Sequence, residues 1–140
     1  MSTVLTDGGE ELLRQVHPIM CPDGEPARTA FTPTKKDDGK LSTLRGRVSA
    51  DEAYRRHVEG LQLQSAGTWV VTVGEANDAG CVALDDGDDL GVPDHASVDF
   101  SEAGSRRNVE RAARKLRDAA VTRGCRFVPA SPTSGVSSPA

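Results

Sequence analysis

The sequence predicts a small α+β domain in which a mixed, mainly antiparallel sheet is packed by two or three helices. Three observations support this fold class. The chain has 140 residues, the usual length of a single domain. Its clearest apolar repeat has a helical period and lies near the C-terminus. Upstream, short β-rich stretches separated by turn residues lack the regular strand–helix alternation of a parallel sheet.

The predicted domain covers residues 10–128. Residues 1–9 are expected to be a flexible N-terminus. Residues 129–140 are rich in Pro, Ser and Ala and contain one aliphatic residue larger than alanine, so they are predicted to be a disordered tail.

The C-terminal helix is predicted to begin after Ser105 and to end at Gly124. Ser105 offers an N-cap oxygen, and glycine tolerates the backbone conformation that stops a helix. The apolar residues recur with a period of 3.6 and are mostly alanine, so this helix is expected to lie close against a sheet: Val109, Ala112, Ala113, Leu116, Ala119 and Ala120.

A second helix is predicted from Ser49 to about Gly60, because Ser49 and Glu52 have the spacing of a capping box. The stretch from Glu10 to Val16 fits either a short helix or a strand. Candidate strands are Arg28 to Thr32, Leu41 to Leu44, Thr68 to Val73, Cys81 to Leu84, Ser97 to Phe100 and Arg126 to Val128. Thr68 to Val73 has the strongest β-branched content.

The composition indicates a cytoplasmic bacterial protein. The first eleven residues contain three acids and lack the basic and apolar regions of a secretory signal. No run approaches the roughly 18 apolar residues of a membrane helix. Three cysteines, an odd number without a C-x-x-C pair, are expected to be free thiols, and Cys21 is expected in an exposed loop. High Ala, Asp, Arg and Gly content is associated with GC-rich bacterial genomes.

Charge is strongly segregated along the chain. Residues 75–102 contain nine acidic residues and no Lys or Arg, whereas residues 106–126 contain eight basic residues against two acidic ones, a net charge of +6. Such segregation favours binding of a protein partner through both segments. The residues expected to contact it are Arg107, Arg111, Arg114, Arg117, Asp86, Asp88 and Asp89.

Neither a metal nor a nucleic acid is predicted as a ligand. If the acidic loop filled a calcium-binding pattern from Asp86, Leu90 would stand at the fifth ligand position and Ser97 at the twelfth. The loop is therefore interpreted as solvated. The net charge of −4 and the lack of aromatic residues among the basic ones argue against nucleic acid.

Polar residues at the ends of predicted elements are the candidate catalytic residues: Arg14, His17, Ser42 and His95. Strand alternation places His95, Ser97 and Asp99 on one face, which is either a solvent-exposed surface or a site surface, and their neighbours on the core face. His57 lies on the inner stripe of the second helix and is interpreted as a packing residue. The common enzyme signatures are absent.

The order of these elements resembles that of small ADP-ribosyltransferase-type domains. The resemblance rests on an early arginine in Leu13-Arg14, a Leu41-Ser42-Thr43 strand and the following helix from Ser49. It implies that Arg14 contacts NAD, that Ser42 supports the site, and that Glu75 or Glu102 is the catalytic acid.

Two functions follow from these observations. The first is a cytoplasmic binding or accessory module that engages a protein partner through the acidic loop and the basic helix, without a cofactor. The alternative is a small enzyme that uses a nucleotide or NAD. The first explains the segregated charge, and the second explains the polar residues at element ends.

Overall fold

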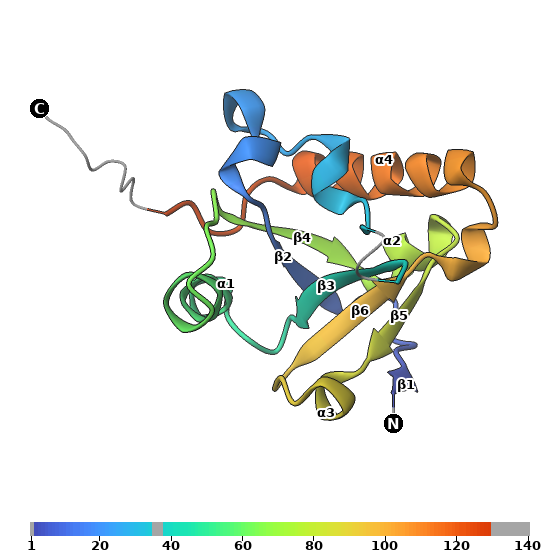
Figure 1. Cartoon of the computed structure of the whole chain (residues 1–140), viewed down its shortest axis with the longest axis horizontal. Coiled ribbons are helices and arrows are strands. Elements are labelled where there is room, and N and C mark those ends of the chain that lie inside the picture. The colour runs from blue at the N-terminus through green and yellow to red at the C-terminus, as the bar shows by residue number, and fades with distance from the viewer. Residues whose placement is uncertain (1, 35–37, 130–140) are drawn as a thin grey trace, which may run out of the picture.

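The computed structural model describes residues 2–34 and 38–129, which form a six-stranded antiparallel sheet covered by helices (Figure 1). The strand order is β1-β5-β6-β3-β2-β4. The strands are β1 (Thr3–Val4), β2 (Glu11–Gln15), β3 (Lys40–Arg45), β4 (Thr68–Thr72), β5 (Val82–Asp85) and β6 (His95–Asp99). The predicted α+β class is confirmed.

The longest helix of the described chain is α4 (Arg106–Arg123). The others are α1 (Ala50–Arg55), which continues as a π-helical turn over Arg56–Gly60, α2 (Val73–Asp78) and α3 (Gly87–Leu90). Short 3₁₀ turns cover Pro18–Met20, Pro22–Gly24, Arg28–Phe31 and Ser101–Ala103. None of the helices in the described part of the chain has both the length and the apolar character needed to cross a membrane.

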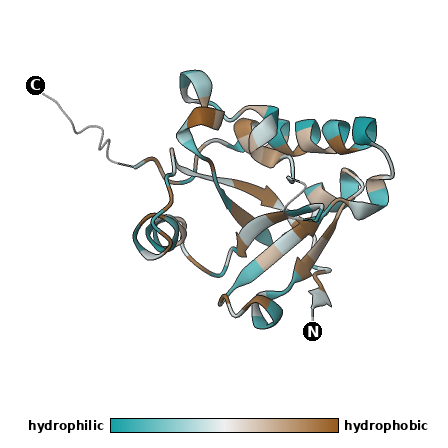
Figure 2. Ribbon diagram, in the orientation of Figure 1, coloured by the Kyte–Doolittle hydropathy of each residue, from teal (hydrophilic) through white to brown (hydrophobic). Residues whose placement is uncertain are grey.

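One face of the sheet packs against α4 and carries the larger core. Figure 2 shows hydrophobic residues along the strands and α4 divided between hydrophobic and hydrophilic residues. Four of the six residues of the predicted stripe are buried, Ala112, Ala113, Leu116 and Ala120, and the other two, Val109 and Ala119, are half-buried. The opposite face is partly covered by α1 in a smaller cluster of Leu13, Val48, Ala53 and Val70. Leu12 and Leu13 point to opposite faces, as alternation along β2 requires.

The helix caps explain where the helices begin. Ser49 Oγ accepts from the Glu52 N–H and Ser105 Oγ from the Asn108 N–H, so both predicted N-caps are present. The other half of the predicted capping box at Ser49 is not formed, because the Glu52 carboxylate accepts from Arg55 and Arg56 instead. Thr72 and Glu75 form a complete capping box at α2, which the sequence analysis missed. Gly124 follows α4 with a φ of 95°, a value that favours glycine.

Two strand predictions are wrong. Arg28–Phe31 is a 3₁₀ turn, because Ala30 and Phe31 are both buried in the same core and adjacent strand residues cannot face the same side. The stretch from Arg126 to Val128 forms only an isolated bridge, between Phe127 and Thr68. The ambiguous stretch after Glu10 is a strand, β2.

The domain extends further toward the N-terminus than residue 10. Strand β1 pairs with β5, and Leu5 is buried in the main core. At the other end, residues 130–140 of the predicted tail lie outside the described residues.

The outer edge of the sheet at β4 is blocked by an ion pair between α2 and α4. Arg123 donates to the Val70 carbonyl oxygen at 2.8 Å and to both carboxylate oxygens of Glu75 at 3.0 and 2.7 Å. These guanidinium hydrogen bonds lower the pKa of Glu75 below its ordinary value near 4.5. The pair therefore covers an edge that would otherwise accept another strand.

Replacing Glu75 by Gln should lower the free energy of unfolding by about 1 kcal/mol at neutral pH, because the amide keeps an acceptor for the Thr72 N–H but removes the ion pair. A carboxyl whose pKa is depressed on folding stabilises the fold above its unfolded pKa and loses that effect as the pH falls through the folded pKa. The difference between wild type and Glu75→Gln in urea unfolding should therefore shrink as the pH falls below about 4.5.

The exposed Glu102 provides the control, because it forms no ion pair with the described residues. Glu102→Gln should leave both the stability and its pH dependence unchanged. A Glu75→Gln effect that persists undiminished in acid would contradict the role of the ion pair.

Candidate functional site

A buried polar cluster joins the start of α3 to strand β6. The Asp86 carboxylate lies 2.6 Å from His95 Nδ1 through one oxygen and accepts from Ser97 Oγ at 2.5 Å through the other. Asp86 and His95 are each 8% exposed and Ser97 is 3% exposed. We call these three residues the Asp86 clasp. It satisfies both carboxylate oxygens in a setting where an unpaired charge would be costly.

The tight chain path between β5 and β6 brings Asp86 onto the sheet. A Cβ at Gly87 would lie 2.7 Å from the Val92 carbonyl oxygen, so only glycine fits there without a shift of the backbone. The Val92 N–H donates back to the Gly87 carbonyl at 3.0 Å. Gly91 has a φ of 67° and ends α3 in the left-handed region. The glycines therefore fold the acidic loop back over β6.

The clasp orients the imidazole. An ionised carboxylate only accepts hydrogen bonds, so the contact with Asp86 fits an Nδ1–H donor on His95. Nε2 forms no hydrogen bond with the described residues. Ser97 is bonded to Asp86 rather than to the imidazole, so the cluster is an Asp–His pair and not a serine triad.

The four candidate catalytic residues do not converge. Arg14 on β2 lies opposite the core residue Trp69 on the neighbouring strand β4, so both side chains are on the same face of the sheet. The Arg14 guanidinium donates to the carbonyl oxygens of Ala30 at 2.9 Å and Ser42 at 3.0 Å. His95 on β6 lies opposite Leu44 on the neighbouring strand β3, and Leu44 packs in the smaller cluster on the face of the sheet covered by α1. The sheet therefore separates the Arg14 side chain from His95.

The remaining two candidates lie at different places. His17 is exposed, and its Nδ1 accepts from the Ile19 N–H at 3.1 Å, so it caps a 3₁₀ turn. Ser42 is exposed and pairs with Ser97 across β3 and β6, which puts the Ser42 side chain on the same face as His95. Only Ser42 and His95 of the four thus share a surface.

Two cavities lie elsewhere on the molecule. One, of about 380 Å³, is at the start of α4 and is lined by residues that include Gly39, Phe100, Ser105 and Arg106. The other, of about 350 Å³, is lined by Glu75, Asp118, Ala119, Thr122 and Arg123. Neither is lined by Arg14, His17, Ser42 or His95. The second is lined by Glu75, which the resemblance to ADP-ribosyltransferases offers as a catalytic acid and which is paired with Arg123.

His57 is half-buried, in keeping with a packing role. Burial lowers its pKa, and the nearby positive charges of Arg14 and His17 lower it further, against a backbone hydrogen bond with Gln64 that raises it.

The free cysteines are poor nucleophiles. Burial raises the pKa of Cys21, which is half-buried rather than exposed, and raises that of Cys81 to about 11.

Two carboxylates of the acidic loop, residues 85–94, are paired with arginines of the domain. Asp85 pairs with Arg45 at 2.8 Å, and Asp94 pairs with Arg47 at 2.7 Å and with Arg56 at 3.2 Å. The interpretation of the loop as solvated is therefore wrong for Asp86, which is buried in the clasp. Asp88 and Asp89 are exposed on α3. Among the described residues no group of three or more His, Cys, Asp or Glu side chains is placed to hold a metal ion.

The basic residues of α4 differ in whether they are paired within the chain. Arg106 pairs with Glu110 and Arg123 with Glu75. Arg117 bends toward the domain, where it donates to the Pro26 carbonyl oxygen at 2.8 Å and pairs with Glu25 and Asp118. The remaining four are exposed along the outer face and form no ion pair with any described residue: Arg107, Arg111, Arg114 and Lys115. We call these four residues the basic stripe. Lys115 was missed by the sequence analysis, although its helical spacing places it beside Arg111.

Comparison with known proteins gives no relative. No family model, no curated protein and no solved structure matches this chain. The resemblance to ADP-ribosyltransferases therefore has no support from these comparisons.

Replacing Asp86 by Ala should lower the free energy of unfolding by about 2–3 kcal/mol, because His95 Nδ1 and Ser97 Oγ lose their buried acceptor. Asp88→Ala, two residues away on the exposed side of the same turn, should change it by less than about 0.5 kcal/mol. Urea unfolding of the two variants measures the difference. Equal effects would show that the clasp does not hold the turn.

Proposed function

We propose that this chain is a binding module whose basic stripe on α4 docks an acidic surface of a protein partner. The observation that carries the proposal is the stripe itself. Its four cations have no carboxylate partner among the described residues, whereas Arg45, Arg56, Arg117, Arg123 and Arg126 are all paired within the chain. An acidic partner would supply the missing charges.

The stripe is unfavourable for the isolated helix. Arg107 and Arg111, and Arg111 and Lys115, are four residues apart, a spacing at which like charges repel by about 0.2–0.5 kcal/mol per pair. The first turn of α4 also contains no acidic residue, and Arg106 and Arg107 stand where the helix dipole favours negative charge. Charges that cost stability without an internal partner are typical of a binding surface.

A protein partner fits this surface better than a nucleic acid. Three of the five aromatic residues, Phe31, Trp69 and Phe100, are buried. The other two, Tyr54 and Phe127, contact each other with ring centroids 5.0 Å apart. The stripe therefore has no aromatic side chain on which bases could stack.

The test is the binding of fluorescein-labelled poly-L-glutamate, measured by anisotropy, with a labelled single-stranded oligonucleotide as the comparison. Arg111→Gln/Arg114→Gln should weaken poly-L-glutamate binding about tenfold and leave stability unchanged or raised by about 0.5 kcal/mol, since repulsion along the helix is relieved. Binding should weaken as salt is added.

Arg47→Gln/Arg55→Gln is the matched control, because it removes two exposed charges outside α4, where the side chains are 58% and 50% exposed. This control should bind like wild type. Equal weakening by both double variants, or tighter binding of the oligonucleotide than of poly-L-glutamate, would contradict the proposal.

A second candidate is the small enzyme that uses a nucleotide or NAD. The observation in its favour is the contact of the Arg14 guanidinium with the Ser42 backbone carbonyl oxygen at 3.0 Å, although the Ser42 side chain lies on the other face of the sheet. NAD should then raise the melting temperature of wild type, and this shift should be absent in Arg14→Ala when each protein is compared with its own ligand-free melt. No shift for wild type at millimolar NAD would eliminate this candidate.

A further inference from the structure

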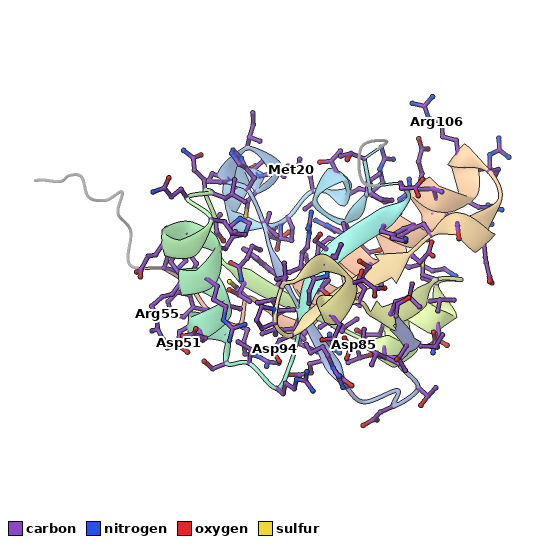
Figure 3. The ribbon with its side chains drawn as sticks, turned by 60° about the horizontal axis from the view of Figure 1, so that its bottom comes forward. Met20, Asp51, Arg55, Asp85, Asp94 and Arg106 are labelled. Carbon is purple, nitrogen blue, oxygen red and sulfur yellow. The ribbon has the colours of Figure 1, made fainter. Side chains whose placement is uncertain are left out.

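Helices α3 and α4 lie on opposite sides of the molecule. Figure 1 places α4 along one side of the sheet and α3 on the other, and Figure 3 shows Asp85 and Asp94 beside α3, away from Arg106 at the start of α4. We propose that the turn that contains α3, residues 86–92, docks in one copy of this chain on the basic stripe of a second copy. We call these residues the α3 turn. This inference rests on the proposed function and names the partner.

The α3 turn has the surface chemistry that the stripe requires. Asp88 and Asp89 are exposed in its first turn. Beside them Leu90 is 56% exposed and Val92 is 38% exposed, so the turn combines negative charge with apolar contact area. Its carboxylates complement the cations of the stripe, and two copies can align these surfaces because each copy carries both.

The turn is held in one conformation before binding. The buried Asp86 clasp anchors its first residue to β6, and the close approach of Gly87 to the Val92 carbonyl oxygen closes the loop. The His95 N–H also donates to the Val92 carbonyl oxygen at 3.2 Å, so the second end of the turn is tied to the start of β6 as well. A preorganised turn loses little conformational entropy on docking, which strengthens an interface with few charges.

The two surfaces do not overlap, so docking through one leaves the other available. Such a contact joins different patches on the two copies, and repeated contacts build open chains of copies or rings rather than a closed twofold dimer. Association should depend on protein concentration and decrease with salt, because the charges are exposed.

Sedimentation velocity of the full chain over a range of protein concentrations is the experiment. At low salt, wild type should form species larger than a dimer, and high salt should return it to monomer. The stripe variant Arg111→Glu/Arg114→Glu and the α3 variant Asp88→Lys/Leu90→Ser should each remain monomeric while keeping a folded thermal transition. Wild type that stays monomeric at low salt and high concentration overturns the inference.

A mixture of the two variants provides the decisive comparison. The stripe variant retains an intact α3 turn and the α3 variant retains an intact stripe, so the mixture should form a complex of one copy each and nothing larger. Monomers alone in the mixture, or larger species in either variant alone, overturn the inference. If wild type stays monomeric but still binds poly-L-glutamate, only self-docking fails. If wild type does not bind poly-L-glutamate either, the proposed function is contradicted as well.

Discussion

The packing of the alanine stripe of α4 against the sheet is the contact on which the rest of the structure depends. Ala112, Ala113 and Ala120 are buried with Leu116 in the main core, which also contains residues of strands β2 to β6. Small side chains let the helix lie close to the strands, which leaves no room beneath it for long cationic side chains. Cations at the flanks, such as Arg117 and Arg123, reach carbonyl oxygens of the domain. Those on the outer face are left exposed.

Folding changes the charge pattern seen in the sequence. The acidic segment loses much of its charge to internal partners: Asp85 to Arg45, Asp94 to Arg47 and Arg56, and Glu75 to Arg123. Asp86 is withdrawn into the clasp with His95 and Ser97. The basic segment keeps four cations that form no ion pair with the residues described by the structure. Positive surface charge is therefore concentrated on α4, with a smaller acidic surface at α3.

Local patterns predicted the elements that local interactions determine. The period of α4, its Ser105 cap and the β-branched stretch around Val70 and Val71 each correspond to an element of the fold. The failures have long-range causes. Arg28–Phe31 is a 3₁₀ turn because two adjacent side chains must reach one core, and sequence alternation cannot report that requirement. For the Asp86 clasp, alternation placed His95 and Ser97 on one face, but nothing local indicated that the loop would return over them.

The central claim is that α4 presents a surface for an acidic partner, and its most direct measurement is an NMR titration of ¹⁵N-labelled protein with poly-L-glutamate at low protein concentration. The account predicts that the largest amide shifts fall on Arg107, Arg111, Arg114 and Lys115, with amides of α1 unchanged. Shifts centred on another face, or no shifts at saturating poly-L-glutamate, would contradict it.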